Sequence, residues 1–339
     1  MTHERIQSQR PPCRRLTGVR VQATGSYVPD GVVTNDHLRE RLGCDSEWII
    51  KRTGILERRH ALPHQATSDL CYEAGRRCLD QAGVLPEDID LLLVGTFTPD
   101  MTFPSVGCLV QNRLKLACPA VDIQAACAGF MYALVTGAAY VLAGVSKRAL
   151  VIGGDCNSRI VNPHDLKTFP LFGDGAGAVL LTPGRPDQGL VSYSLGADGS
   201  GADLLNRPAC GSRLPPTGEL LAKNMHYLHM DGRGVFRWAV AILCDTIQDV
   251  LKASSLDARA VDLYIPHQAN IRIINALDVL HIPRSKVFIN LDRYGNTSGG
   301  SIPLALDEAV AGGRIKPGSL VMLSGFGAGL SWGTALMRW

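Results

Sequence analysis

Residues 121–130 read VDIQAACAGF, which predicts a short strand that turns directly into a helix. The turn holds one cysteine, Cys127, between two alanines and followed by a glycine. The continuation, AGFMYALVTGAAYVLAG, is apolar on nearly every face, which is typical of a helix that is buried on all sides. The stretch therefore places Cys127 at the N-terminus of a central helix.

This position favours two different interpretations of Cys127. A helix N-terminus carries partial positive charge and unsatisfied N–H groups, both of which favour a thiolate over a thiol. The flanking small residues would also leave room for a bulky acyl group. However, free cysteine is among the most buried residue types, and this chain has 10 cysteines. From this stretch alone, a reactive cysteine and a packing cysteine are equally good explanations.

The composition narrows the class of protein. A chain of 339 residues is long enough for two domains or one duplicated domain. With 46% hydrophobic and 19% charged residues, it is typical of a globular enzyme. A net charge of +3 is too balanced for a dedicated nucleic-acid binder. The cysteines form no C-x-x-C pair, so we expect no zinc or iron–sulfur site and no bound metal.

No segment of the sequence predicts export or membrane insertion. Residues 1–16 are polar and basic without an apolar centre, so we interpret them as a flexible leader. The longest apolar run, ALVTGAAYVLAGV, is too short and too rich in glycine to span a bilayer. We therefore expect a cytoplasmic protein with reduced thiols and no membrane contact.

Strand-like and helix-like segments alternate along the chain, which predicts an α/β fold. Residues 68–83 carry apolar side chains four apart and end at Gly83, as expected of a helix. Three continuous apolar runs are typical of strands buried on both faces. These runs are residues 90–97, 149–155 and 261–267.

The chain also repeats parts of itself. LPEDIDLLLVG in the first half corresponds to LDARAVDLYIPH in the second, each after a predicted helix. FGDGAGAVLL in the first half is echoed by FGAGLSWGTALM near the end. We interpret the chain as two related halves, residues 17–185 and 186–339, that meet near TPGRPDQG.

The second half offers partners for a nucleophile. His267, in IPHQANIRI, directly follows a predicted buried strand, where open α/β sheets place their sites. Asn296 lies in the Gly/Ser-rich turn RYGNTSGGSIP, and the glycines of SGFGAGLSWG could bring N–H groups close to a substrate oxygen. A structural histidine and two ordinary turns would explain the same residues. Neither GDGAG nor GFGAG fits the dinucleotide pattern G-x-G-x-x-G.

Taken together and in this order, the motifs resemble β-ketoacyl-acyl-carrier-protein synthase III of the thiolase superfamily. The matching blocks are SEWIIKRTGI, AACAGF, FGDGAGAV, PHQANIRI, GNTS and GFGAGLSWG, spread over residues 17–339. The resemblance implies a thiolase-like five-layer α-β-α-β-α fold built from two duplicated halves, and a homodimer.

The resemblance also implies an activity and a catalytic trio. The trio is Cys127, His267 and Asn296, with an oxyanion hole formed by the N–H groups of Cys127 and Ala328. The implied enzyme is an acyltransferase that initiates fatty acid biosynthesis. It would condense a short acyl-CoA primer, through acyl-Cys127, with malonyl-acyl-carrier protein. The products would be β-ketoacyl-carrier protein, CoA and CO₂, and no permanently bound cofactor would be needed.

Further positions follow from the resemblance alone. Arg237 and Arg272 would contact the acidic acyl carrier protein, and Phe103 would reach from one protomer to cap the acyl pocket of its partner. A solvated surface explains the two arginines as well. The positions implied to bind CoA and its pantetheine arm are Trp48, Arg52, Leu166, Lys167, Met230, Gly232, Phe236 and Asn270.

Some positions depart from the usual pattern of this family. Cys44 stands where a threonine is common, and Leu166 and Lys167 replace an Arg-Gly pair that helps to clamp adenine. Two alternatives to an initiating β-ketoacyl-carrier-protein synthase stay open. One is a starter-unit synthase or acyltransferase of polyketide and secondary metabolism, and the other is a catalytically silent scaffold. The sequence specifies neither the chain length of the primer nor the pathway.

Overall fold

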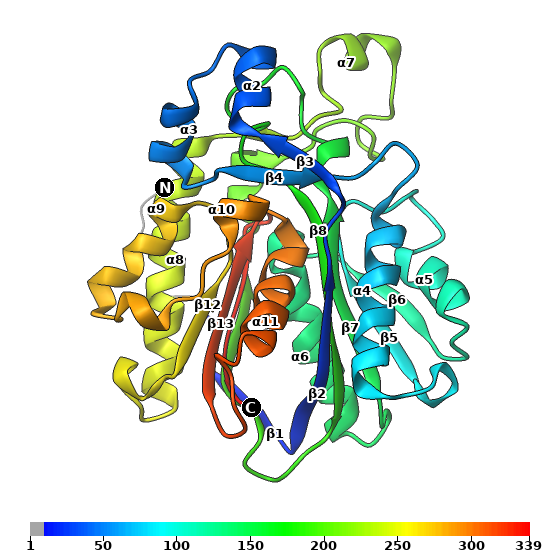
Figure 1. The fold of residues 1–339 in the computed structure, drawn as a ribbon, viewed down its shortest axis with the longest axis vertical. Helices are drawn as coiled ribbons and strands as arrows, with labels where there is room; N and C mark the ends of the chain where they lie inside the picture. Colours follow the sequence, from blue (N-terminus) through cyan, green and yellow to red (C-terminus); the bar gives the residue numbers. More distant parts are fainter. Residues whose placement is uncertain (1–9) are drawn as a thin grey trace.

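The computed structural model describes residues 10–339, which form two five-stranded sheets (Figure 1). The first sheet has the order β2-β8-β7-β5-β6. Strands β6, β5 and β7 are parallel, and β8 and β2 continue the sheet in antiparallel pairs. The bounds are β2 (Val19–Tyr27), β5 (Leu91–Gly95), β6 (Ala120–Ile123), β7 (Ala149–Cys156) and β8 (Asp174–Pro183).

The second sheet has the order β1-β9-β14-β13-β12. Strands β12 and β13 are parallel, and β14, β9 and β1 follow in antiparallel pairs. Beyond β12, Val287 forms a parallel bridge to Tyr264. The bounds are β1 (Arg14–Thr17), β9 (Gly189–Ala197), β12 (Leu263–Pro266), β13 (Leu320–Gly327) and β14 (Ser331–Arg338).

The two sheets share one pattern of strand order and direction. The segment at Val287, β12, β13, β14 and β9 corresponds in turn to β6, β5, β7, β8 and β2: two parallel steps are followed by two antiparallel ones. The connection between β8 and β9 runs over residues 184–188, within the stretch TPGRPDQG. This correspondence supports an origin by duplication.

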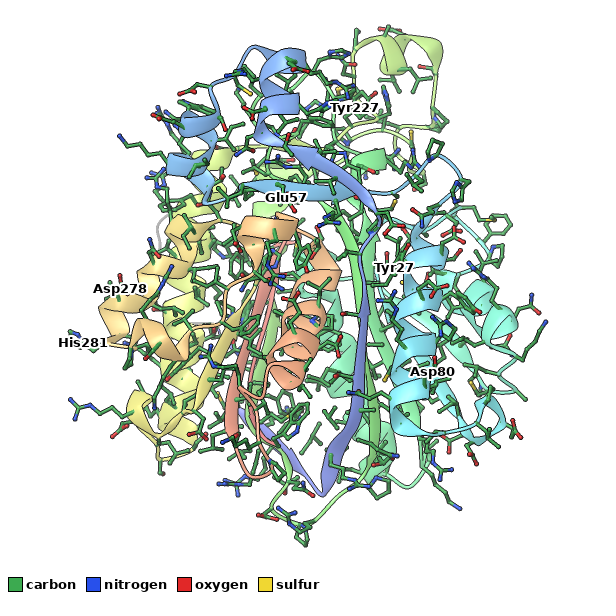
Figure 2. The ribbon with its side chains drawn as sticks, viewed as in Figure 1. Tyr27, Glu57, Asp80, Tyr227, Asp278 and His281 are labelled. Atoms are coloured by element: carbon green, nitrogen blue, oxygen red, sulfur yellow. The ribbon has the colours of Figure 1, made fainter. Side chains whose placement is uncertain are left out.

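Helices form three layers around the two sheets. Helices α6 (Gly129–Leu142) and α11 (Ser301–Ala311) lie between the sheets and share one apolar core with both of them. Helices α4 (Thr67–Ala82) and α5 (Val106–Leu114) cover the outer face of the first sheet, and α8 (Gly232–Ala253) covers that of the second. The predicted α-β-α-β-α fold is confirmed, with side chains filling the space between layers (Figure 2).

Local sequence explains several of these elements. Helix α4 ends at Gly83, whose left-handed φ of 62° suits glycine, as the periodicity predicts. Helix α6 is apolar throughout, and Phe130 and Met131 at its start are completely buried. Helix α8 begins at Asp231, whose carboxylate accepts hydrogen bonds from the N–H groups of Arg233 and Gly234. The three predicted buried strands correspond to β5, β7 and β12.

Shorter elements gather above the ends of the sheets (Figure 1). Strands β3 and β4 pair as a hairpin, and two helices lie between them in the sequence. Strands β10 and β11 pair as a second hairpin, which comes between β9 and α8 in the sequence. In the sequence, helices α9 and α10 come between β12 and α11. Their bounds are β3 (Gly31–Thr34), α2 (Asn35–Leu42), α3 (Ser46–Thr53), β4 (Glu57–His60), β10 (Leu205–Asn206), α7 (Gly218–Ala222), β11 (His229–Met230), α9 (Ile271–Ile274) and α10 (Leu291–Tyr294).

The expectation of a flexible leader is wrong for its described part. Residues 14–17 form β1, which pairs with β9 at the edge of the second sheet. The guanidinium of Arg10 lies 2.9 Å from Asp245 and 2.7 Å from Asp249, and these ion pairs hold the chain against α8. Residues 1–9 lie outside the described part of the structure. Within residues 10–339, no helix has the length and apolar character needed to cross a bilayer.

Candidate active site

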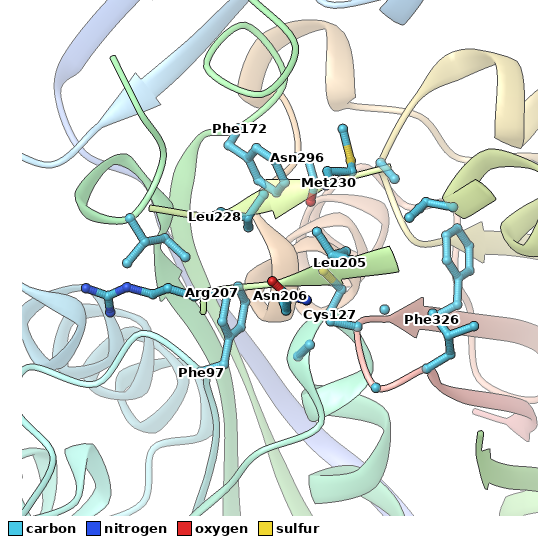
Figure 3. Close-up of a pocket in the computed structure, with 18 of the residues that line it drawn as sticks. Phe97, Cys127, Phe172, Leu205, Asn206, Arg207, Leu228, Met230, Asn296 and Phe326 are labelled. Atoms are coloured by element: carbon cyan, nitrogen blue, oxygen red, sulfur yellow. The ribbon is translucent and has the colours of Figure 1, made fainter. Parts of the chain in front are cut away.

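The predicted trio lines one cavity of about 540 Å³, and Figure 3 labels two of its members, Cys127 and Asn296. Cys127, His267 and Asn296 all line it. Cys127 lies on the short 3₁₀ turn η2 (Ala126–Ala128) between β6 and α6, His267 directly follows β12, and Asn296 lies just beyond α10. Three segments far apart in the sequence therefore meet at one site, and this volume is typical of a small-molecule pocket.

The turn that carries Cys127 is held from the opposite half of the molecule. Gly327, the last residue of β13, packs so closely that an added Cβ would lie 2.7 Å from the Cys127 nitrogen. The Ser331 hydroxyl lies 2.9 Å from the carbonyl oxygens of both Ala125 and Ala328, and so links the turn to the 327–331 loop. Glycine is needed at position 327 because any side chain would displace the nucleophile.

Burial opposes ionisation of the Cys127 thiol. Desolvation raises the pKa of Cys127 to about 12, although a hydrogen bond with the Ser298 side chain opposes the rise. The side chain is 7% exposed, and only towards the cavity that it lines. Burial thus acts against the thiolate that the helix N-terminus favours, and the thiolate stays a prediction.

His267 is a neutral imidazole in this environment. It is 1% exposed, and burial lowers its pKa to about 3. Its backbone N–H donates to Ser324 on the neighbouring strand, and its ring meets the edge of Phe326 with centroids 5.2 Å apart. Among residues 10–339, the ring nitrogen Nδ1 has no hydrogen-bond partner. A neutral ring can donate from Nε2, which is the role that a developing oxyanion requires.

Asn296 is fixed by its backbone and by its own amide oxygen. Its N–H donates to Leu171 O (2.8 Å), and its carbonyl accepts from Gly173 N (3.0 Å). The N–H of Ser298 donates to Asn296 Oδ1 at 2.9 Å. Because Oδ1 is occupied, the side-chain NH₂ group remains as the donor that this residue can offer to a ligand in the cavity.

A second layer of polar residues, not identified from the sequence, holds this turn in place. The Ser298 hydroxyl donates to Asn157 Oδ1 (2.9 Å), and Asn157 Nδ2 donates to the carbonyl of Gly173 (2.7 Å). The buried carboxylate of Asp155 accepts from the N–H of Gly299 at 2.8 Å. Burial raises the pKa of Asp155 to about 6, opposed by backbone hydrogen bonds including that of Gly299. Strand β7 and the residues after it thus anchor the asparagine turn.

The residues predicted to contact the pantetheine arm line the cavity that also holds Cys127. Met230, Gly232, Phe236 and Asn270 line the same cavity as Cys127, as does Ala328. Asn270 caps helix α9 by accepting from the N–H of Arg272 with Oδ1. Its NH₂ group is therefore the part available to an amide carbonyl of a ligand.

The residues predicted to bind the adenine end lie apart from this cavity. The Arg52 guanidinium stacks on Trp48, 4.5 Å from the ring centroid, so the two form an intramolecular cation–π pair. Leu166 is exposed, and Lys167 lines a second, polar cavity of about 590 Å³. Leu228 and Met230 line both cavities, which are therefore adjacent.

Of the remaining predicted residues, Phe103, Arg237 and Arg272 are exposed and Cys44 is buried. Phe103 is 82% exposed, near the start of α5, and does not line the cavity of its own chain. Arg272 lies over the ring of Phe236 at 5.2 Å, beside the cavity, whereas Arg237 points from α8 into solvent. Cys44 is buried in a small apolar cluster beside α3, which identifies it as a packing residue.

Sequence reasoning missed most of the apolar wall of the cavity. Phe172 and Phe326 belong to quoted motifs, FGDGAGAV and GFGAG, and could have been assigned to the site from that position. The hairpin of β10 and β11 contributes residues without any local signal. The main apolar residues of the wall are Phe97, Phe172, Leu205, Leu228, Trp238 and Phe326.

These features define a condensing-type acyltransferase of the thiolase fold, and comparisons with known proteins specify the family. Residues 121–199 match the family model 3-Oxoacyl-[acyl-carrier-protein (ACP)] synthase III, and residues 251–339 match the model for its C-terminal part. A β-ketoacyl-[acyl-carrier-protein] synthase III of Rhodopirellula baltica is 55% identical, over 96% of this chain and 99% of its own. One of Desulfitobacterium hafniense is 46% identical, over 96% of this chain and 98% of its own.

Solved structures of two condensing enzymes are also similar to this chain. The 3-oxoacyl-[acyl-carrier-protein] synthase III of Aquifex aeolicus is 40% identical with a TM-score of 0.88, over 95% of this chain and all of that one. The priming β-ketosynthase of the R1128 polyketide pathway is 34% identical with a TM-score of 0.87, over 97% and 98% of the two chains. The chain belongs to the β-ketoacyl-acyl-carrier-protein synthase III family. The predicted acyltransferase activity, the initiating condensation of fatty acid synthesis, is confirmed at this level.

Proposed function

We propose that Cys127 takes an acyl group from a short acyl-CoA primer and passes it to malonyl-acyl-carrier protein. The observation that carries this assignment is the convergence of Cys127, His267 and Asn296 on one buried cavity. In the first half-reaction, the Cys127 sulfur bonds to the primer carbonyl carbon, and the bond from that carbon to CoA breaks. The proton that Cys127 loses balances the one that the departing CoA thiolate takes up.

The oxyanion of this first step would lie between β13 and the nucleophile turn. The N–H groups of Cys127 and Ala328 are the proposed donors, and the close packing of Gly327 against Cys127 supports this placement. One such preorganised donor is typically worth about 3–4 kcal/mol of transition-state stabilisation. Because burial raises the pKa of Cys127 to about 12, the sulfur would have to lose its proton as it attacks, and the N–H donors would stabilise the oxyanion that forms.

The second half-reaction uses the other two residues. Loss of CO₂ from the malonyl group leaves negative charge on its thioester oxygen, and Nε2 of His267 and Nδ2 of Asn296 would donate to it. The low pKa of His267 keeps the ring neutral at working pH, so this donor neither carries nor loses a charge. The carbanion then attacks the acyl carbon on Cys127, which releases the thiolate and forms the β-ketoacyl product.

We also propose which surfaces contact the carrier protein and a second copy of the chain. The carrier protein would dock on the face that carries Arg237 and Arg272, because both are exposed and Arg272 packs beside the cavity on Phe236. A homodimer would form at β6, an edge strand of the first sheet with Val121 49% exposed. Phe103, 82% exposed in the single chain, would then enter the pocket of the partner.

Intact-protein mass spectrometry after incubation with a panel of acyl-CoAs tests the first half-reaction. The wild type should gain the mass of one short acyl group, and Cys127→Ala should gain none while keeping its thermal unfolding temperature. The mass that is added also names the primer, and so separates a fatty acid primer from a starter unit of polyketide synthesis. Acylation that persists in Cys127→Ala would remove Cys127 from the mechanism.

A further inference from the structure

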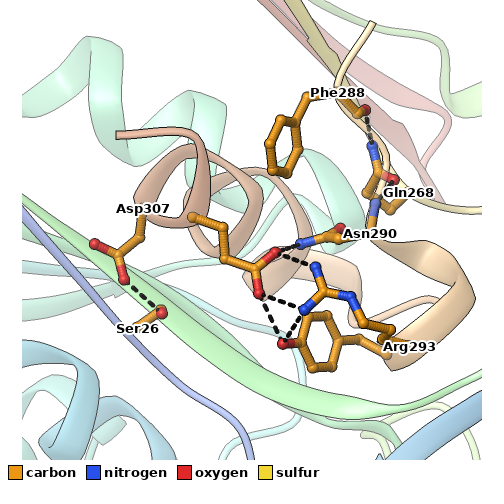
Figure 4. A network of polar contacts seen from close by, with 8 residues as sticks. Ser26, Gln268, Phe288, Asn290, Arg293 and Asp307 are labelled. Atoms are coloured by element: carbon orange, nitrogen blue, oxygen red, sulfur yellow. Dashed lines mark hydrogen bonds and ion pairs between the residues drawn. The ribbon is translucent and has the colours of Figure 1, made fainter. Parts of the chain in front are cut away.

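Glu308 of helix α11 is the centre of a polar network, and Figure 4 labels two of its partners, Asn290 and Arg293. Oε1 of Glu308 accepts from Arg293 at 3.1 Å and from the Tyr294 hydroxyl at 2.7 Å. Oε2 accepts from Arg293 at 2.8 Å and from Asn290 Nδ2 at 2.9 Å. The Glu308 side chain is 23% exposed, so most of this carboxylate is removed from water. A two-pronged arginine–carboxylate pair is both strong and geometrically restrictive.

One arm of the network leads to Asn296. Arg293 and Tyr294 are the last two residues of α10, and only Gly295 separates them from Asn296. Gly295 has a φ of 64°, so the chain reverses sharply there. Because Glu308 holds both residues that precede this turn, it restrains the point from which Asn296 enters the cavity.

The other arm leads to His267. The N–H of Asn290 donates to Oε1 of Gln268, the residue after His267, at 3.1 Å. Gln268 Nε2 in turn donates to the carbonyl of Pro266, the residue before His267, at 2.8 Å. The Gln268 amide thus connects both neighbours of the histidine to Asn290, which Glu308 holds through its side chain.

We propose that Glu308 is a positioning residue for decarboxylation: it sets the distance between the two donors, His267 and Asn296. The two come from different segments, β12 and the end of α10, and Glu308 is joined to each of them through the contacts just described. Cys127 does not belong to this network, because its turn is held instead by Gly327 and Ser331. The inference rests on the proposed roles of His267 and Asn296, and it predicts that Glu308 serves the second half-reaction and not the first.

Glu308→Gln is the sharpest perturbation of this network. Each carboxylate oxygen accepts two donors, so either orientation of the new amide would turn its NH₂ group towards two groups that also donate. The shape of the side chain is kept, while one oxygen and the charge are lost. The matched control is Asp307→Asn on the same helix, since the Asp307 carboxylate accepts hydrogen bonds from the hydroxyl groups of Thr24 and Ser26 on β2, a strand that carries neither His267 nor Asn296.

The experiment compares two rates in each variant: acylation of Cys127 by acyl-CoA, and CO₂ release from malonyl-carrier protein. Glu308→Gln should slow CO₂ release by roughly 10- to 100-fold, the range expected when a catalytic donor moves by about 1 Å, and leave acylation unchanged. Asp307→Asn should leave both rates unchanged. Tyr294→Phe, which removes one donor to Glu308, should reproduce the effect in smaller measure, and it decides the matter if Glu308→Gln does not fold.

The outcomes separate this inference from the proposed function. Equal losses in both rates, unchanged CO₂ release, or the same loss in Asp307→Asn would overturn the positioning role of Glu308. Asn296→Ala is measured alongside. If Asn296→Ala releases CO₂ at the wild-type rate, the proposed function itself is wrong. If Asn296→Ala fails and Glu308→Gln is normal, only the inference about Glu308 falls.

Discussion

The floor of the cavity, formed by Cys127, His267 and Asn296, differs from the proposed CoA entrance, formed by Trp48 and Leu166, in how the residues are held. At the floor, Cys127, His267 and Asn296 are all less than a tenth exposed, and backbone contacts fix the segments that carry them. At the entrance, Trp48 and Leu166 are 39% and 43% exposed, and neither lines the cavity. The residues at the floor are therefore held in place by buried contacts, whereas the residues proposed to bind the coenzyme are partly surrounded by water.

This difference has an energetic meaning. Hydrogen bonds and charges at the floor act in a low dielectric, so each misplaced group has a large effect on rate. Contacts at the entrance are screened by salt and typically contribute less than about 1 kcal/mol each. Substitutions at the floor should therefore change reaction steps, and substitutions at the entrance should change affinity and selectivity.

The largest effect on rate is expected at the close contact between Gly327 and Cys127, at the floor of the cavity. Gly327→Ala would place a Cβ 2.7 Å from the Cys127 nitrogen, so the nucleophile must move. Acylation of the protein by acyl-CoA should fall by at least about 100-fold, measured by intact mass against time. Gly218→Ala, where an added Cβ meets nothing within 4 Å, should acylate normally. Normal acylation of Gly327→Ala would show that this contact does not position Cys127.

The second prediction concerns the pH dependence of Cys127 labelling, which tests how strongly burial raises the pKa of this thiol. Because burial raises the pKa of Cys127 to about 12, the thiolate fraction should grow about tenfold for each unit of pH well below that value. The rate of Cys127 labelling by iodoacetamide should thus rise about 100-fold between roughly pH 7 and pH 9 without levelling off. Cys127→Ala protein supplies the background of the other cysteines. A plateau below pH 8 would mean that the helix N-terminus outweighs desolvation.

A smaller effect is expected from Phe103, the most exposed large apolar residue of the described chain. If it closes the pocket of a partner subunit, Phe103→Thr should shift selectivity towards longer acyl-CoAs, because relief of overpacking is worth about 1–3 kcal/mol. Competition between short and long primers, read by mass spectrometry, measures the shift. Met101→Thr, exposed in the same loop, should leave the profile as it is. An unchanged profile in Phe103→Thr would place the end of the pocket elsewhere.

The smallest effect is expected on CoA affinity, from a substitution of Leu166 at the proposed entrance. Leu166→Arg should tighten CoA binding by about 0.5–1 kcal/mol, because a guanidinium can stack on adenine where leucine offers only apolar contact. Calorimetry at low and high salt should show the gain, and the wild-type KM for primer should rise with ionic strength. Val279→Arg adds the same charge at an exposed residue that lines neither cavity, and should not tighten binding. Unchanged affinity of Leu166→Arg would mean that this segment does not contact adenine.

The same contrast explains what the sequence could predict. Cys127 and His267 stand at turns that directly follow strands, and such turns have local signals, so their places were predictable. Strand β1 is four residues long with two arginines, and only its pairing with β9 makes it a strand. The contact of Ser298 with Asn157 joins positions 141 residues apart, and no local pattern encodes it. The cation–π pair of Arg52 with Trp48 depends on exposed rotamers, which sequence motifs do not specify.

The central claim is that the floor of one cavity performs two half-reactions with different residues. The most direct test measures both half-reactions in two variants: acylation by acyl-CoA, and CO₂ release from malonyl-carrier protein, in Cys127→Ala and in Asn296→Ala. We predict that Cys127→Ala gains no acyl mass but still releases CO₂, because His267 and Asn296 are intact, and that Asn296→Ala is acylated but releases no CO₂. If acylation fails in Asn296→Ala, or if CO₂ release is lost in a folded Cys127→Ala, the division of labour between these residues is wrong.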